Sequence, residues 1–303
     1  GSPTDPARVA LPPYYPRDPV ILQDWADYLD CCRQTDREVG EWIARLEREK
    51  LLANTVVFFM TDHGISHARG KQFLYDEGTH VPLVAAGPGV PSGRVVADLV
   101  EHIDLTATSL AIAGVRPPAW MQGRDLFSPD YRKRDAVFAA RDRCDETMEH
   151  IRSVRTDRFK YIRNYLPERP HLQPCRYKDE KAIVKKLREL HAAGTLDSVA
   201  EKLLFAPRRQ PEELYDLQAD RHEVTNLASD PSHRETLLQM RARLADWETR
   251  TNDKGRTPEP MAMYDSDMRE YLSTGGKAAL DDLRKNIEQN KKWAMTESKA
   301  AQP

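Results

Sequence analysis

The fold is decided by residues 54–64, an apolar run that ends in a polar turn and reads Asn54-Thr55-Val56-Val57-Phe58-Phe59-Met60-Thr61-Asp62-His63-Gly64. Unbroken β-branched and aromatic residues are typical of a strand that is buried on both faces of a parallel sheet. In open α/β sheets, ligands bind outside the carboxyl ends of the strands, so Asp62 and His63 stand where a site would be built. A carboxylate beside an imidazole suits a divalent metal, and Gly64 lets the backbone turn tightly next to a bound group.

The segments around this run predict an α/β unit. Upstream, residues 20–52 carry apolar side chains three, four or seven positions apart with charged residues between them, which predicts an amphipathic helix. Downstream, residues 80–86 predict a second strand that ends at Gly87-Pro88-Gly89, and residues 105–113 predict a helix closed by Gly114. The α/β pattern ends near Pro117.

Beyond this point the pattern changes to short strands and separate helices. Residues 136–140, 150–154 and 159–165 predict strands of an antiparallel sheet, and residues 179–204 and 232–251 show helical spacing. From residue 252 the charge is high and apolar residues are sparse, which predicts a polar tail that is mobile or wraps the surface. We therefore expect an α/β portion over residues 1–130, an α+β subdomain over 131–251 and the tail over 252–303.

The charge balance argues against two classes of partner. The chain has 46 Lys and Arg against 48 Asp and Glu, which leaves no basic footprint for nucleic acid or an anionic membrane. No apolar run approaches the roughly 20 residues that a membrane-spanning helix needs. Four cysteines are too few for a disulfide framework, so we interpret them as structural thiols, with a Cys144–Cys175 bridge as the alternative.

A lysine follows the polar turn on the loop that leads to the second strand. Lys71, after Gly70, could bind an oxyanion as a point charge. Each candidate also has an ordinary structural interpretation: Asp62 could cap the next turn, His63 could be a polar loop residue, and Lys71 could be a solvated loop lysine. The residues taken one at a time do not decide between these interpretations.

A collinear series of motifs resembles the type I sulfatases of the alkaline phosphatase-like superfamily. Their strand ends in Ser-Asp-His-Gly or Ser-Asp-Asn-Gly and is followed by Gly-Lys and Tyr-Glu, which compare with Asp62-His63-Gly64, Gly70-Lys71 and Tyr75 with Glu77 here. Further matches are Leu11-Pro12-Pro13-Tyr14, His102-Ile103-Asp104-Leu105, Gly123-Arg124-Asp125-Leu126, Arg152-Ser153-Val154-Arg155-Thr156-Asp157 and Glu213-Leu214-Tyr215-Asp216-Leu217. The C-terminal layout is most similar to the sulfamidase-related branch.

This resemblance implies a fold and a reaction. The fold would be the C-terminal part of an alkaline phosphatase-like sandwich with a mainly parallel sheet, followed by a small antiparallel α+β subdomain. Asp62 and His63 would ligate a divalent ion, commonly calcium, with manganese and zinc as alternatives, and Lys71 would contact the sulfate or leaving-group oxygen. The reaction would be hydrolysis of a sulfate ester or sulfamate through a formylglycine nucleophile. The substrate would be a sulfated carbohydrate or another sulfate ester. Arg141 and His150 are weaker candidates for substrate contacts.

The nucleophile of the family is absent from the sequence. Its motif is Cys or Ser, any residue, Pro, any residue, Arg, and no cysteine or serine here begins that pattern. The family's paired aspartates and upstream histidine are missing as well. We therefore expect the N-terminal half of the same protein as a partner and little activity from this chain alone.

Two other functions remain open at the level of sequence. Phosphonate monoester and phosphodiester hydrolases of the same superfamily share the Asp-His-Gly strand end, and a non-catalytic glycan-binding remnant could keep the fold. By family resemblance, the compartment would be periplasmic, extracellular or lysosomal.

Overall fold

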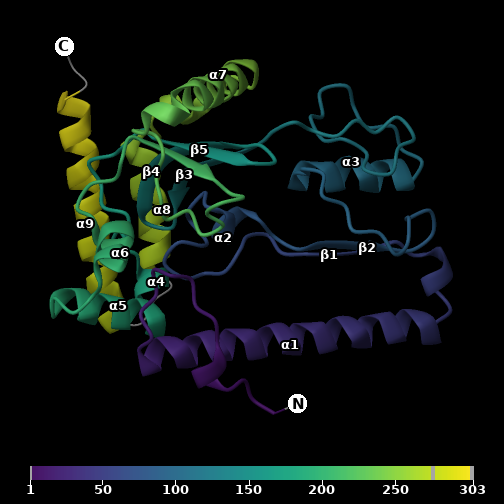
Figure 1. Cartoon of the computed structure of the whole chain (residues 1–303), viewed down its shortest axis with the longest axis horizontal. Coiled ribbons are helices and arrows are strands. Elements are labelled where there is room, and N and C mark those ends of the chain that lie inside the picture. The colour runs from purple at the N-terminus through teal and green to yellow at the C-terminus, as the bar shows by residue number, and fades with distance from the viewer. Residues whose placement is uncertain (1, 274–276, 301–303) are drawn as a thin grey trace.

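The computed structural model describes residues 2–273 and 277–300. Its first layer is a two-stranded sheet between two helices (Figure 1). Helix α1 (Pro19–Arg48) and helix α3 (His102–Ile112) lie on either side of β1 (Val57–Met60) and β2 (Leu83–Ala86). Asp18 caps α1 by accepting a hydrogen bond from the Val20 N–H at 2.8 Å, and Pro19 fits the first turn. The predicted helix, strand and helix are confirmed.

The sequence predicted a mainly parallel first sheet, and the described chain contributes one antiparallel pair to it. Strands β1 and β2 pair antiparallel, with Phe58 opposite Ala85. The chain reverses direction through a compact loop, so adjacent strands in sequence become antiparallel neighbours. The run is also only partly buried, since Met60 and Val84 are 38% and 58% exposed. An apolar run predicts a buried strand but does not specify which strands flank it.

A second sheet has four antiparallel strands in the order β3-β4-β5-β6. Its strands are β3 (Val137–Cys144), β4 (Thr147–Arg155), β5 (Phe159–Asn164) and β6 (Glu212–Asp216). Helix α7 (Arg234–Arg250) covers one face, where its leucines and Met240 pack on Val154, Tyr161 and Leu214. This antiparallel sheet was predicted from the sequence, except for β6.

The opposite face of the second sheet carries the loop that follows β1. Phe73, Leu74 and Tyr75 pack against Ile151 and Ile162, with Tyr215 in the same cluster. Because side chains alternate between the two faces of a strand, one sheet binds helix α7 on one side and this loop on the other. The second sheet therefore fixes the position of the loop that contains Asp62, His63 and Lys71.

Four further helices lie in the connections between strands. Helix α2 (Asp76–Thr79) lies between β1 and β2 in the sequence. Between β5 and β6 come α4 (Arg176–Asp179), α5 (Ala182–Ala192) and α6 (Ser198–Ala200). Ile183, Val184 and Leu187 of α5 are fully buried in a cluster with Tyr14, Tyr15 and Ile21. This cluster joins the start of α1 to the later part of the chain, in agreement with the contacts between α1 and α5.

The C-terminal segment was predicted as a polar tail and instead forms two packed helices, α8 (Met261–Ser273) and α9 (Lys277–Ala300). Leu283 and Ile287 of α9 are buried with Tyr264 and Met268 of α8. Polar residues also contribute to the packing, since Asn290 accepts a hydrogen bond from the Met148 N–H of β4 at 3.1 Å. A few apolar residues at helical spacing are enough to pack these helices, because polar side chains beside them form hydrogen bonds with the sheet.

Candidate functional site

The loop after β1 is built by close backbone contacts at its glycines. The Gly64 N–H donates a hydrogen bond to the Gly78 carbonyl at 2.9 Å, and a Cβ at Gly64 would lie 1.9 Å from the Glu77 carbonyl oxygen. Gly70 is equally constrained, since its Cβ would lie 1.8 Å from the Ile65 carbonyl oxygen. Only glycine fits these positions, so the loop from Asp62 to Gly78 is a compact unit.

Asp62 and His63 lie side by side at the end of β1. The Asp62 side chain is 83% exposed, and its Oδ2 lies 3.5 Å from Nε2 of His63. The other ring nitrogen, Nδ1, lies 2.7 Å from the Gly64 carbonyl oxygen, which can only accept a hydrogen bond. Nδ1 therefore carries a proton, and in the Nδ1–H tautomer of the imidazole the Nε2 lone pair lies beside the carboxylate.

This donor pair fits a divalent cation. A carboxylate oxygen is a ligand that suits calcium and manganese, whereas an imidazole nitrogen suits zinc. Two side chains provide only part of a coordination shell. The remaining ligands would have to come from outside Asp62 and His63.

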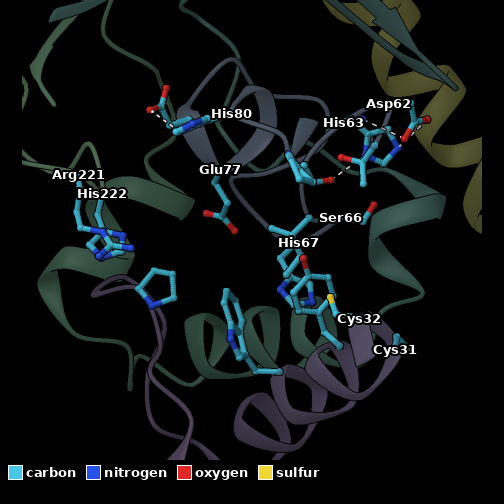
Figure 2. A pocket seen from close by; sticks show the side chains of 18 of the residues that line it. Cys31, Cys32, Asp62, His63, Ser66, His67, Glu77, His80, Arg221 and His222 are labelled. Atoms are coloured by element: carbon cyan, nitrogen blue, oxygen red, sulfur yellow. Dashed lines mark hydrogen bonds and ion pairs between the residues drawn. The ribbon is translucent and has the colours of Figure 1, made fainter. Parts of the chain in front are cut away.

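The two residues line an open pocket of about 1400 Å³. Figure 2 shows Asp62 and His63 on one side of it and Arg221 and His222 on the other. Helix α1 contributes another wall, where Cys31 and Cys32 are exposed. These two cysteines are thus accessible from the pocket and are not core residues, as structural thiols would be.

Cysteines throughout the described chain carry free thiols, so the alternative Cys144–Cys175 bridge is not formed. Burial raises the pKa of the Cys175 thiol to about 11. A buried thiol of this kind stays protonated at neutral pH, which agrees with a structural role.

Lys71 lies next to the pocket but is not part of its lining. Its backbone N–H donates to the Ile65 carbonyl at 2.7 Å, which closes the loop on itself. The Nζ atom lies 4.2 Å from the ring centroid of Tyr177. The hydroxyl of Tyr177 lies 2.9 Å from Oγ of Ser66, and Ser66 does line the pocket. Lys71 is therefore at the pocket's edge.

The predicted substrate contact Arg141 is a buried residue of β3 that lies outside the pocket lining. It is 8% exposed, donates to the Gln72 carbonyl at 2.5 Å and to Thr147 Oγ1 at 3.0 Å, and lies over the ring of Phe73. These contacts favour a role in holding the loop that carries Lys71. Its contact with substrate stays a prediction that the geometry does not support.

His150 is also outside the lining of the pocket. Its ring stacks on Tyr165 with 4.0 Å between centroids. Burial, and then the positive charge of Arg152, lower its pKa, so the imidazole is neutral near pH 7. The geometry favours packing for His150 as well, and its role as a substrate contact stays a prediction.

The structure adds a histidine–aspartate pair to the lining of the pocket. Nε2 of His67 lies 2.9 Å from Oδ1 of Asp24 on α1. Burial acts to raise the pKa of Asp24, but the His67 contacts outweigh it and the pKa is lowered. The helical spacing of α1 could have indicated Asp24, because it shares a face with Tyr28.

Two residues on the far wall of the pocket were missed entirely. Arg221 is exposed and faces the pocket, and His222 packs edge-on against Tyr14 with 6.4 Å between ring centroids. Burial, and then the positive charge of Arg221, lower the pKa of His222. Both follow β6, a strand that the hydrophobic pattern did not predict.

A second cluster of metal-binding side chains lies away from this pocket. Among the described residues, Asp145, Glu146 and Cys175 have ligand atoms within 4.8 Å of one another, and none of the three lines the pocket. Oε1 of Glu146 already accepts hydrogen bonds from the Arg176 N–H and Asn286 Nδ2. This cluster therefore joins α4 and α9 to the sheet.

Two protein-family models match this chain. The sulfatase family model matches residues 3–115, and a model described as N-sulphoglucosamine sulphohydrolase, C-terminal, matches residues 63–203. The chain belongs to the sulfatase family. The first model includes Asp62, and the second begins at His63. The second match supports the sulfamidase-related layout that the sequence motifs resembled.

Similar curated proteins are sulfatases. The chain is 33% identical to an ulvan-active sulfatase of Formosa agariphila over 252 residues, which are 82% of this chain and 42% of that protein. It is 29% identical to human N-sulphoglucosamine sulphohydrolase over 268 residues, which are 82% of this chain and 52% of that protein. This sulfatase chain thus spans about half the length of the curated relatives it matches.

A solved structure supports the fold. The crystal structure of yidJ from Bacteroides fragilis superposes with a TM-score of 0.54 at 21% identity, over 84% of this chain and 48% of that chain. At this identity the likeness establishes the α/β architecture of the alkaline phosphatase-like fold and nothing finer. No helix in the described ranges is long and apolar enough to span a membrane.

Proposed function

We propose that the chain is the C-terminal half of a sulfuric ester hydrolase that cleaves sulfate esters or sulfamates. The observation that carries the proposal is the pair Asp62 and His63, with an exposed carboxylate oxygen 3.5 Å from the ring Nε2 in the lining of a large pocket. Sulfatase relatives over 82% of the chain give this pair its chemical context.

In this proposal Asp62 and His63 hold a divalent cation, calcium in preference to manganese or zinc. A bound cation supplies positive charge to the sulfate oxygens and the departing oxygen. Lys71 adds an ammonium beside the same group and stabilises the charge that develops on it in the transition state. The protein's task is to keep these charges fixed, and the compact loop held on the second sheet supports it.

The nucleophile would come from the N-terminal half of the protein, as a formylglycine made from a cysteine or serine. Two features support a partner at this position. Within residues 2–273 and 277–300, the first sheet has two strands, with Val84 58% exposed, and Ile21 and Ala26 are the buried residues of α1. A half-covered α/β layer needs another layer to bury its apolar side chains. The missing half of the relatives' length would supply it.

The substrate would be a sulfated carbohydrate. The names of the two relatives point to sulfated sugars, ulvan in one case and N-sulphoglucosamine in the other. The pocket lining includes both carboxylates and cations, and Arg221 and Lys181 are two of the cations. In this proposal these two side chains contact the sulfate groups of the sugar chain. Such an enzyme would act in the periplasm, outside the cell or in a lysosome.

The test is a substrate panel applied to the full-length protein. We expect release of inorganic sulfate from a sulfated oligosaccharide or a sulfamate, together with one tightly bound divalent ion per protein. Preferential cleavage of phosphonate monoesters or phosphodiesters would favour the other branch of the superfamily. Absence of both turnover and a stoichiometric ion would indicate a glycan-binding remnant.

A further inference from the structure

We propose that Tyr177 is a positioning residue for Lys71, and that the face of its ring orients the lysine ammonium toward the anionic group in the pocket. This inference rests on the proposed function, because Lys71 is the cation assigned to the sulfate. It adds a residue from α4, which lies more than 100 positions later in the sequence than the loop after β1.

The environment of Lys71 is the first argument. Its Nζ lies 4.2 Å from the Tyr177 ring centroid, inside the range of a cation–π contact. Within residues 2–273 and 277–300, no carboxylate lies within ion-pair distance of this Nζ. A carboxylate would orient the ammonium and also neutralise it, whereas a ring orients it and leaves the full positive charge for a substrate.

The ring itself is held from both ends. At its tip, the Tyr177 hydroxyl and the Ser66 hydroxyl lie 2.9 Å apart, which ties the ring to the loop that carries Lys71. At its base, α4 is fixed because the Cys175 N–H donates to Asp179 at 2.9 Å and the Arg176 N–H donates to Glu146 at 2.7 Å. A ring that cannot swing can position a flexible four-carbon side chain.

A second ammonium strengthens the argument. Nζ of Lys181 lies 4.5 Å from the same ring centroid, and Lys181 lines the pocket. Like Lys71, it has no carboxylate at ion-pair distance in the described part of the chain. Two uncompensated ammonium groups beside one ring raise the local positive potential at the pocket's edge, which suits an oxyanion.

The hydroxyl of Tyr177 offers a competing role that can be separated from the ring's role. Its hydrogen bond with Ser66, and then the charges of Lys181 and Lys71, lower the pKa of Tyr177 although burial opposes the change. A phenol of this kind could act on the substrate directly. If the ring does the positioning, removal of the hydroxyl, which also removes the bond to Ser66, should cost less activity than removal of the ring, because α4 still holds the ring at its base.

The first experiment measures steady-state kinetics of the full-length protein with a sulfated oligosaccharide. Tyr177→Phe keeps the ring and its support from α4 but loses the bond to Ser66, so its kcat should fall by no more than about threefold. Tyr177→Leu removes the ring and should lower kcat roughly tenfold with a smaller change in KM, because the ammonium is no longer held where charge develops. Tyr177→Met is a second variant without a ring, in case the leucine variant folds poorly. Equal losses in Tyr177→Phe and Tyr177→Leu would overturn the proposal.

The second experiment reads the contact without turnover. Lysines of the full-length protein are converted to ¹³C-dimethyl-lysine, which keeps their charge, and the Lys71 signal is assigned by its loss in Lys71→Gln. A methyl resonance over a ring face shifts upfield, so wild type and Tyr177→Phe should show the shift and Tyr177→Leu should lose it. An unshifted Lys71 signal in the wild type would overturn the proposal.

The two experiments also separate this inference from the proposed function. If the wild type releases no sulfate but the Lys71 signal is shifted upfield by Tyr177, the proposed function fails and the positioning contact stands. If sulfate is released and Tyr177→Leu turns over at the wild-type rate, the proposed function stands and the role of Tyr177 is refuted.

Discussion

The Tyr75 hydroxyl donates a hydrogen bond to Oε2 of Glu213 at 2.9 Å, and this bond joins the loop after β1 to strand β6. Both residues are about 6% exposed. The pair connects a segment that begins with Asp62 to a strand residue 138 positions after Tyr75. The candidate site thus depends on a part of the chain that contributes no ligand to it.

Tyr75→Phe tests this connection. We expect the free energy of unfolding to fall by about 1 kcal/mol, the net contribution of a typical hydrogen bond, because Glu213 keeps its bonds from Tyr215 and Asn164. Tyr131→Phe is the matched control, since its buried hydroxyl has no hydrogen-bond partner in the described structure. Urea unfolding at pH 7 measures both. An equal loss in the two variants would show that the Tyr75 bond contributes nothing specific.

Asp62→Ala tests the metal pair. In the full-length protein we expect divalent-ion affinity to fall by at least about 100-fold, because half of the donor pair is removed. Asp157→Ala is the control, because Asp157 is an exposed carboxylate that lines the same pocket but lies far from Asp62 in the sequence. Calorimetric titration of the chelator-treated protein with calcium gives both affinities. Unchanged affinity in Asp62→Ala would remove this residue from the metal site.

Arg221→Ala tests recognition of the substrate's charge. We expect KM for a sulfated oligosaccharide to rise roughly tenfold with little change in kcat, which is the pattern for a lost charge-assisted contact away from the reacting bond. Salt should reduce the difference between variant and wild type, because the contact is exposed. Arg116→Ala, an exposed arginine outside the pocket, should leave KM unchanged. A fall in kcat alone would place Arg221 at the reacting centre instead.

Lys178→Met tests a buried amine beneath the loop. Burial, followed by the positive charge of Arg141, lowers the pKa of Lys178 to about 7, and its Nζ donates to the His67 carbonyl at 2.5 Å. An unfolded lysine has a pKa of about 10.4, so between pH 7 and 10 the unfolded chain binds a proton that the folded protein does not. Wild-type stability should therefore rise with pH in this window, by up to about 1.4 kcal/mol per pH unit from this group.

The variant should lose this pH dependence. The gain in unfolding free energy of Lys178→Met over wild type should be largest near pH 6 and should shrink toward pH 9. Lys185→Met, at an exposed lysine of α5, should show no such trend. A gain that stays constant from pH 6 to 9 would mean that Lys178 is charged in the folded protein across this range.

Local pattern was enough to predict the elements that carry the site. The apolar spacing of α1 and the run at β1 depend on neighbours in sequence, and Asp62 and His63 follow β1 directly, so their position at a strand end could be predicted. Their pocket could not be outlined in the same way. Its far wall includes Arg221, which becomes part of the site only through the pairing of β5 with β6.

Long-range partners account for what the local pattern could not predict. The local pattern does not show that Arg141 donates to the Gln72 carbonyl or that the His150 ring stacks on Tyr165. The C-terminal segment looked too polar to pack, but Asn286 and Asn290 bond to Glu146 and the Met148 N–H. Pairing of β1 with β2 depended on the loop between them, which the strand pattern does not encode.

The most direct test of the central claim is sulfate release by the full-length protein, with calcium present, from a sulfated oligosaccharide. Ion chromatography should detect inorganic sulfate from the wild type, and Lys71→Gln should lower kcat by about 100-fold or more, as expected for the loss of a preorganised charge at the reacting group. Absence of sulfate release from any sulfate ester or sulfamate, or a Lys71→Gln variant that turns over at the wild-type rate, would contradict the account.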